Sequence, residues 1–132
     1  MCVFCKIASG EFNSSKIYED DKVLAILDLS QATYGHTLVM PKQHYENIFD
    51  LDNELAKHLF SVVQKISNHY KKTIPNIKGV NLLNNSGEKA GQTVMHFHMH
   101  ILPRYEDDDL VDIKFTEHKL NLNDICEQLK IK

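Results

Sequence analysis

Short apolar runs bounded by polar or turn-forming residues predict five strands. Residues 16–20 and 22–28 are separated only by the polar pair Asp20-Asp21, which indicates a β-hairpin. A third strand covers residues 35–41 and ends at Pro41, a fourth covers 79–84, and the last covers 93–102. Because these strands follow one another in hairpin-like succession, the pattern favours a mainly antiparallel sheet.

Between the third and fourth strands the apolar period changes to three or four residues, which predicts one long amphipathic helix. Asp50 or Asp52 is its N-cap, and it ends before Pro75. Its apolar positions are Leu51, Leu55, Leu59, Val62, Val63, Ile66 and Tyr70. A short terminal helix is expected over residues 121–129. The sequence therefore predicts an α+β fold in a single domain covering residues 1–132.

Composition narrows the classes of partner. The formal net charge is −3, and no basic stripe with interleaved aromatic residues occurs, which argues against binding to long nucleic acid. A small anionic ligand remains compatible with this charge. No leader-like or membrane-length apolar segment is present, so we expect a cytoplasmic protein without a membrane partner. The acidic run at residues 107–109 is expected to be a solvated loop, and no role is assigned to it.

The chemically informative segment contains His96, His98 and His100. On a strand these three imidazoles point to one face, whereas Phe97, Met99 and Ile101 point to the other. Each two-residue step rises about 6.7 Å, so one metal ion can reach two neighbouring histidines but hardly all three. Exposed surface histidines, or two ligands of a metal site, are the alternatives to a catalytic row.

A neutral imidazole is suited to nucleophilic attack on phosphorus and is a good leaving group once it is phosphorylated. Its second nitrogen must donate a hydrogen bond, and the phosphoryl oxygens need nearby donors. The polar loop before the last strand offers such donors in Asn85, the backbone of residues 87–91, Gln92 and Thr93.

Two of the three cysteines form the pair Cys2-x-x-Cys5, at a spacing that suits either a metal or a redox site. A closed zinc site needs two further ligands, for which His44 is one candidate. Redox motifs of this spacing usually open a helix after a strand, whereas this pair lies at the start of the chain. Cys126 is expected to be a small buried apolar residue.

The segment His96-Phe-His-Met-His100-Ile-Leu resembles the His-φ-His-φ-His-φ-φ motif (φ, apolar) of the histidine-triad (HIT) superfamily. Further segments similar to bacterial members are Phe4-Cys-Lys-Ile7, Leu27-Asp-Leu-Ser30, Gly35-His-Thr-Leu-Val-Met-Pro-Lys42 and Asn85-x-Gly-x-x-x-Gly-Gln92. The likeness is closest to small bacterial HIT-family hydrolases. It implies a five-stranded antiparallel sheet with two helices, and a homodimer with a continuous ten-stranded sheet.

The resemblance also implies site residues. His98 is the nucleophile that forms a nucleotidyl-histidine intermediate, and His100 assists it. Asp28 holds the ribose hydroxyls as a double acceptor. The other nucleotide-binding positions implied are Phe4, Ile7, Ile26, Leu29, His36, Asn85, Gly91, Gln92 and Thr93, of which the apolar ones fit ordinary core packing nearly as well. A structural zinc ion would be held by Cys2, Cys5, His44 and His96.

The substrate stays open at this level. His100 stands where the galactose-1-phosphate uridylyltransferase branch has Gln, so that branch is disfavoured. Leu102-Pro-Arg104 resembles the dinucleoside-polyphosphate branch, whereas the loop of residues 85–92 resembles the phosphoramidase branch. We expect hydrolysis of purine nucleoside phosphoramidates. The alternatives are a dinucleoside polyphosphate hydrolase, a nucleotide-binding protein with residual catalysis, or a redox or metal-handling module built on the cysteine pair.

Overall fold

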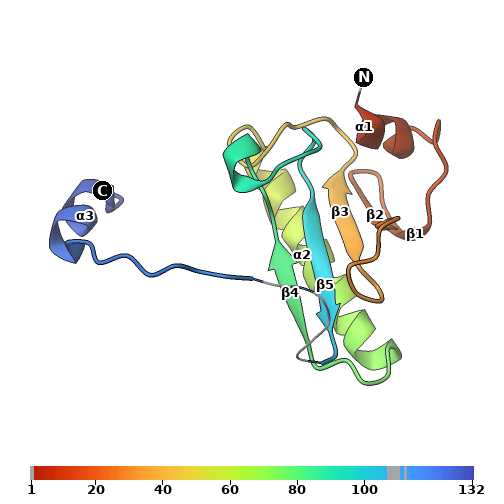
Figure 1. Ribbon diagram of the computed structural model, residues 1–132. Coiled ribbons are helices and arrows are strands. Elements are labelled where there is room, and N and C mark those ends of the chain that lie inside the picture. The colour runs from red at the N-terminus through yellow and green to blue at the C-terminus, as the bar shows by residue number, and fades with distance from the viewer. Residues whose placement is uncertain (1, 107–110, 112) are drawn as a thin grey trace.

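Five strands form one antiparallel sheet in the order β1-β2-β3-β5-β4 (Figure 1). They are β1 (Lys16–Glu19), β2 (Val23–Leu27), β3 (Thr37–Pro41), β4 (Gly79–Leu83) and β5 (Met99–Arg104). The α+β class and the first hairpin are thereby confirmed. The computed structural model describes residues 2–106, 111 and 113–132, so the acidic run at 107–109 lies outside the described residues.

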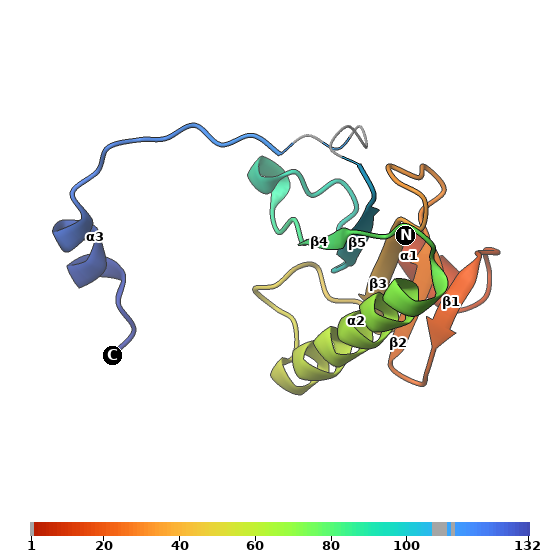
Figure 2. The same ribbon diagram turned by 90° about the horizontal axis from the view of Figure 1, so that it is seen from below.

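Helices cover the two faces of the sheet. The long helix α2 (Asn53–Thr73) lies along one face, and the short helix α1 (Val3–Ala8) lies on the other side (Figures 1 and 2). Asp52 is the N-cap of α2, because its carboxylate accepts the N–H of Leu55 at 3.0 Å. A 3₁₀ turn, η1 (Glu88–Ala90), lies in the loop between β4 and β5. Within the described part of the chain, no helix is both long and apolar enough to cross a membrane.

Alternate residues of β2 pack into two separate apolar clusters. Val23 and Ala25 join the cluster formed with α2, whereas Leu24 and Ile26 join the cluster that contains Phe4 of α1. Since successive strand residues point to opposite faces, a strand covered on both faces is apolar at every position. This explains why β2 reads as a continuous apolar run.

β5 begins six residues later than the sequence predicts, and this part of the prediction is wrong. The last pair between β3 and β5 is Val39 with Met99. Two positions further along β3 stands Pro41, which has no N–H to extend the ladder. The N–H of Phe97 instead donates to the carbonyl of Tyr45 at 2.7 Å. Residues 93–98 therefore form a hydrogen-bonded loop that leads into β5.

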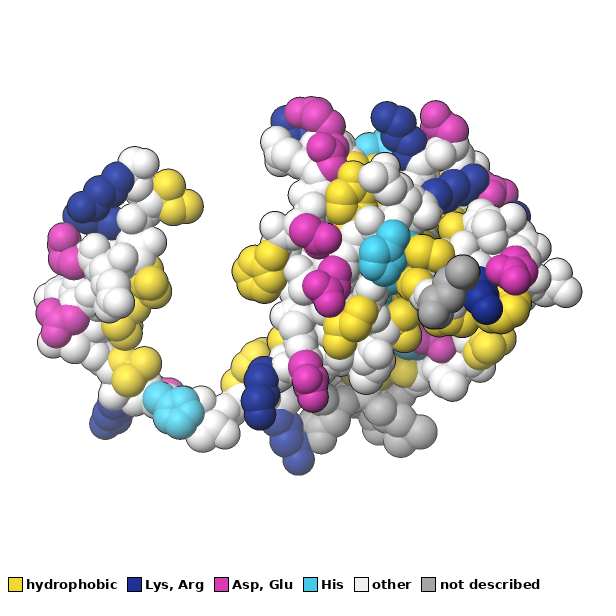
Figure 3. Space-filling view, turned by 90° about the horizontal axis from the view of Figure 1, so that it is seen from above, with side chains coloured by type: hydrophobic (Ala, Val, Ile, Leu, Met, Phe, Trp, Pro, Cys, Tyr) yellow, Lys and Arg dark blue, Asp and Glu magenta, His cyan; other side chains and the backbone are white. Residues whose placement is uncertain are grey.

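The helix at the start of the chain was not predicted. α1 has six residues and buries only Phe4, so the sequence shows no apolar period at residues 3–8. The predicted terminal helix is confirmed as α3 (Leu122–Leu129), with Asn121 as its N-cap. α3 lies away from the sheet (Figures 1 and 3), and Cys126 on it is exposed, so its expected burial is wrong.

A pair of substitutions on α2 tests how the helix is held. Leu59 is 2% exposed in the core under the sheet, and Phe60 beside it is 53% exposed. We expect Leu59→Ala to lower the free energy of unfolding by about 2–5 kcal/mol through lost burial and a cavity. Phe60→Ala should change it by less than about 0.5 kcal/mol. Chemical denaturation of both variants measures the difference, and equal losses would contradict the assigned packing.

Candidate functional site

The three histidines of the row lie on the α1 side of the sheet, although only His100 belongs to a strand. Phe97 and Ile101 pack in the α2 cluster, and Met99 packs against it. The rings of His96 and His98 instead meet Phe4 of α1, at centroid distances of 5.9 and 5.0 Å. The predicted alternation of faces therefore holds across the loop as well as the strand.

A main-chain carbonyl fixes the tautomer of His98. Nδ1 of His98 lies 2.7 Å from the carbonyl oxygen of His96. Because a carbonyl can only accept, Nδ1 carries the proton and Nε2 keeps its lone pair. Burial lowers the pKa of His98, against the opposing effects of this hydrogen bond and of Asp28. The side chain is thus a neutral imidazole with one free basic nitrogen.

His36, the residue before β3, orients His100. The N–H of Ala32 donates to Nδ1 of His36 at 3.3 Å, which places the His36 proton on Nε2. That Nε2 lies 2.9 Å from Nδ1 of His100 and donates to it. His100 consequently carries its own proton on Nε2. Burial, followed by the neighbouring His98 and His36, lowers the pKa of His100 to about 4, so the ring is a neutral hydrogen-bond donor.

His98 and His100 line a cleft of about 500 Å³. Val3, Phe4 and Ile7 of α1 form one wall. The loop between β4 and β5 forms another wall through Asn85, Gly91 and Thr93, and Gly91 there has φ +95°, a conformation that glycine adopts without strain. Such a volume is typical of a small-molecule site.

Most of the predicted nucleotide-binding residues line this cleft. They are Phe4, Ile7, Ile26, Asp28, Leu29, Asn85, Gly91, Thr93, His98 and His100. Two others do not line it. His36 lies behind His100, and Gln92 is 3% exposed with its side chain bonded to the backbone of Gly87, Glu46 and Val94. Gln92 therefore braces the loop from within.

The sequence gives little signal for several residues of the site. Val3, Leu27, Ser30, Leu38 and Val94 also line the cleft. Leu27, Ser30 and Leu38 lie within segments that resemble those of the family, so that resemblance is a usable signal for them. Asn84 donates from Nδ2 to the carbonyl of His98 at 2.9 Å, and nothing in its loop context marks that contact in advance.

Cys2, Cys5, His44 and His96 come together in a cluster beside the cleft, with their ligand atoms all within 4.8 Å of one another. Nδ1 of His96 lies 3.4 Å from Cys2 Sγ and 3.5 Å from Cys5 Sγ. Nδ1 of His44 lies 3.4 Å from Cys5 Sγ and 3.2 Å from Nδ1 of His96. A zinc tetrahedron with two sulfur and two nitrogen ligands has edges of about 3.3–3.8 Å. The spacing of the donors therefore matches such an ion.

The protonation of His96 also suits a metal ligand. Its Nε2 lies 2.7 Å from the carbonyl oxygen of Pro41 and donates to it, which leaves Nδ1 with a free lone pair toward the two thiols. Burial lowers the pKa of this fully buried imidazole and keeps it neutral. Metal-bound histidines commonly donate their second ring N–H to a backbone carbonyl in this way.

Asp28, His36 and His100 form a second group with ligand atoms within 4.8 Å, but their hydrogen bonds do not suit a metal ion. Nδ1 of His36 already accepts the Ala32 N–H, so its Nε2 bears the proton. A protonated ring nitrogen has no lone pair for coordination. His36 and His100 therefore form a hydrogen-bonded pair, and Oδ2 of Asp28 lies 3.6 Å from Nε2 of His36.

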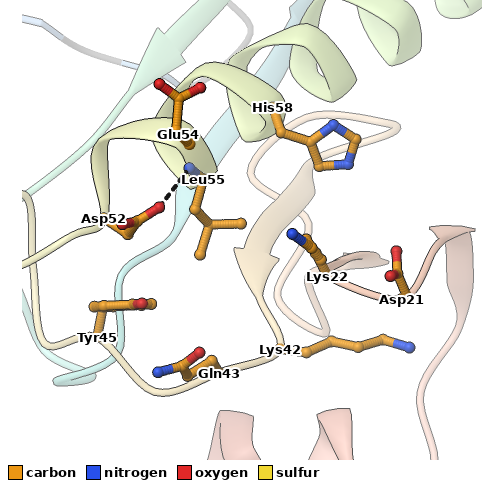
Figure 4. A pocket seen from close by; sticks show the side chains of 9 residues that line it. All are labelled: Asp21, Lys22, Lys42, Gln43, Tyr45, Asp52, Glu54, Leu55 and His58. Atoms are coloured by element: carbon orange, nitrogen blue, oxygen red, sulfur yellow. Dashed lines mark hydrogen bonds between the residues drawn. The ribbon is translucent and has the colours of Figure 1, made fainter.

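A second cleft, of about 520 Å³, lies on the α2 side near the start of that helix (Figure 4). Three of its polar side chains are engaged in structural contacts. Asp52 caps α2, Lys42 pairs with Glu19 at 2.7 Å, and His58 contacts Asp20 at 2.7 Å. The contact of His58 with Asp20 ties α2 to the first hairpin.

Comparison with known proteins gives a family match. The model of the HIT domain family matches residues 9–107. The chain is 56% identical over 104 residues to "Protein hit" of Bacillus subtilis, covering 79% of this chain and 71% of that protein. It is 40% identical over 129 residues to "Adenylylsulfatase HINT3" of Arabidopsis thaliana, covering 97% of this chain and 65% of that protein.

Solved structures give the same result. The crystal structure of a HIT family protein from Bacillus anthracis has a TM-score of 0.90 and 51% identity, covering 97% of this chain and 94% of that one. A Zn-bound histidine triad family protein from Mycobacterium smegmatis has a TM-score of 0.79 and 38% identity, covering 88% and 84% of the two chains.

The protonation of His100 predicts a pH dependence of stability. Its pKa is about 4 in the folded chain, against an ordinary value of 6.5. Between these values the unfolded chain binds a proton that the folded chain does not, so stability falls as the pH drops from about 6.5 to about 4. His100→Gln should make thermal unfolding less sensitive to pH in that range. NMR titration should place the His100 ring near pH 4, and titration near 6.5 would contradict the assignment.

Proposed function

Since the chain belongs to the HIT domain family, we propose that it is a nucleotide hydrolase that cleaves at the α-phosphate of a nucleoside. The observation that carries this proposal is the position of His98. Its Nδ1 is held by the His96 carbonyl, so Nε2 is the ring nitrogen with a free lone pair, and the side chain lines the cleft together with His100. A nucleophile with one fixed proton and one free lone pair is what attack on phosphorus requires.

The proposed reaction has two steps. Nε2 of His98 attacks the α-phosphorus and forms a P–N bond, while the bond from phosphorus to the leaving group breaks. His100 donates its Nε2 proton to that leaving group, because its Nδ1 already accepts from His36. Water then attacks the nucleotidyl-histidine and the P–N bond to His98 breaks, while one proton of that water returns to Nε2 of His100. The nucleotide is released, and neutral His98 and His100 are both restored.

Recognition of the nucleotide is divided along the cleft. Phe4, Ile7, Ile26 and Leu29 provide the apolar surface for the base. The Asp28 carboxylate accepts from the ribose hydroxyls. Asn85, Gly91 and Thr93 lie on the loop wall, where they face the phosphate and the leaving group. His36 and Gln92 act behind this surface, by orienting His100 and bracing the loop.

Purine nucleoside phosphoramidates are the proposed substrates. The cleft of about 500 Å³ suits a single nucleotide. The name of the Arabidopsis relative, an adenylylsulfatase, describes cleavage next to an adenylyl phosphate rather than of a dinucleotide. Dinucleoside polyphosphates remain the second candidate, favoured by Leu102-Pro-Arg104 at the end of β5.

We also propose that Cys2, Cys5, His44 and His96 hold one zinc ion. The donor set, the edge lengths and the Zn-bound relative support it. With four protein ligands the ion has no open position, so it supplies structure and no reaction chemistry. This arrangement reserves His96 for the metal and leaves His98 and His100 for the nucleotide.

A cytoplasmic homodimer completes the proposal. β4 is an edge strand that carries Leu82 and Leu83, 42% and 40% exposed. Pairing of β4 with the same strand of a second copy would give a continuous ten-stranded sheet and cover these side chains. Thiol ligands at Cys2 and Cys5 are consistent with a reducing compartment.

Substitution of the nucleophile tests the mechanism. We expect His98→Ala to lower turnover of an adenosine phosphoramidate by at least about 10³-fold, because no other group forms the covalent intermediate. The matched control is His69→Ala, which alters an exposed histidine on α2. This variant should hydrolyse the phosphoramidate at the wild-type rate. Steady-state kinetics with circular dichroism measures both effects, and an active His98→Ala protein would rule out the assigned nucleophile.

A second assay decides the substrate class. Wild-type protein is compared on adenosine 5′-phosphoramidate and diadenosine tetraphosphate by kcat/KM. Preference for the phosphoramidate is expected, because a cleft of about 500 Å³ suits a single nucleotide. Preference for the dinucleotide would move the protein to the polyphosphate hydrolases. Binding of AMP without turnover of either compound would identify a nucleotide-binding protein.

A further inference from the structure

Helix α1 contributes to the metal cluster and the nucleotide cleft at the same time. Cys2, its N-cap, and Cys5 point to His44 and His96. Val3, Phe4 and Ile7, interleaved with them in the sequence, line the cleft. Residues three apart share one side of a helix, so the two sulfur atoms lie together and the apolar residues lie toward the cleft. A change on one side of α1 must therefore affect the other.

α1 has little to hold it in place by itself. It is six residues long, and its N-cap makes no side-chain hydrogen bond to the first turn. Phe4 is its only buried residue. Isolated helices of this length are unstable in water, because nucleation is unfavourable and few hydrogen bonds follow. Its position consequently depends on tertiary contacts, of which the cluster is one.

The cluster joins three separate segments of the chain. Cys2 and Cys5 belong to α1, His44 follows β3, and His96 precedes β5. The latter two segments are already tied to the sheet, since His96 donates to the Pro41 carbonyl and Phe97 to that of Tyr45. α1 is the part that a metal ion would attach to an otherwise braced framework.

Phe4 is the residue of α1 that contacts His98 in the cleft as well as His96 in the metal cluster. Its ring packs edge-on against His98 at a centroid distance of 5.0 Å and against His96 at 5.9 Å. If α1 leaves the sheet, the cleft loses Val3, Phe4 and Ile7 from one wall, and the ring of His98 loses its aromatic neighbour.

We infer that metal binding at the Cys2–Cys5–His44–His96 cluster sets the affinity of the cleft for nucleosides by holding α1 in place. The inference rests on the proposed function for the identity of the ligand. Cys2 and Cys5 act as positioning residues, since neither lines the cleft itself and both act through Phe4. The metal-bound chain binds a nucleoside tightly, and the metal-free chain binds it weakly.

The test compares zinc-loaded wild-type protein with the same protein stripped by a chelator and dialysed. Isothermal titration calorimetry measures Kd for AMP and for adenosine, which has no phosphate to coordinate stray metal. If α1 remains docked for about a tenth of the time without metal, Kd rises about tenfold. Hydrogen exchange of residues 2–8, measured without nucleotide, should become faster in the stripped protein. Reloading with zinc should reverse both changes.

Matched variants separate this effect from general loss of structure. Cys5→Ser should behave like the stripped protein, and Cys126→Ser, which alters an exposed cysteine on α3, should behave like the wild type. In Phe4→Ala protein, zinc removal should change the adenosine affinity much less, because the connecting ring is absent. Circular dichroism verifies that each variant keeps its fold.

The outcomes are distinguishable. Equal AMP affinity with and without zinc would overturn the coupling and leave the proposed function standing. Hydrogen exchange of residues 2–8 that is unchanged by zinc removal would likewise overturn the coupling and leave the proposed function standing. Failure of AMP and adenosine to bind either form would overturn the proposed function and the coupling with it.

Discussion

The hydrogen bond from His96 Nε2 to the carbonyl of Pro41, 2.7 Å long, joins the end of β3 to the loop that leads into β5. Pro41 has no N–H with which to continue the ladder, so its carbonyl is available to a side chain. The bond buries the His96 ring completely and directs its Nδ1 toward the thiols. The carbonyl of His96 in turn accepts from His98. The carbonyl at the end of β3 therefore fixes which nitrogen of His96 carries the proton, and the carbonyl of His96 does the same for His98.

The three imidazoles of the row have different tasks because their hydrogen-bond partners differ. His96 donates to a carbonyl through Nε2 and faces the metal cluster, whereas His98 donates through Nδ1 and keeps Nε2 free for the cleft. Nδ1 of His100 accepts a hydrogen bond from Nε2 of His36, so His100 carries its proton on Nε2 and presents a donor there. Burial keeps each ring neutral by lowering its pKa. In the function proposed above, an identical residue type thus supplies a metal ligand, a nucleophile and a proton donor.

Much of the fold follows from local pattern. The apolar period of three to four residues located α2 to within a few residues, and of the two candidate caps Asp52 bonds the first turn. The apolar runs located the strands of the hairpin and β3. Strand residues alternate between two faces, so a strand with apolar residues packed on both faces is visible in the sequence as an apolar run. The predicted start of β5 was wrong, because a strand extends only as far as its partner strand offers hydrogen bonds. On β3 the ladder stops before Pro41, which has no N–H. α1 was missed because six residues with a single buried side chain leave no period to detect.

For the site, the sequence by itself determined which chemistry was available: three imidazoles on one face, two thiols at a ligand spacing, and a polar loop before them. The tertiary structure decided which nitrogen of each ring is free, and it brought His44 and His36 from distant segments to His96 and His100. It also decided that Gln92 braces the loop from inside while Asn85 lines the cleft. Residue types and spacing are local properties, whereas protonation and proximity depend on hydrogen-bond partners and burial that the folded chain alone provides.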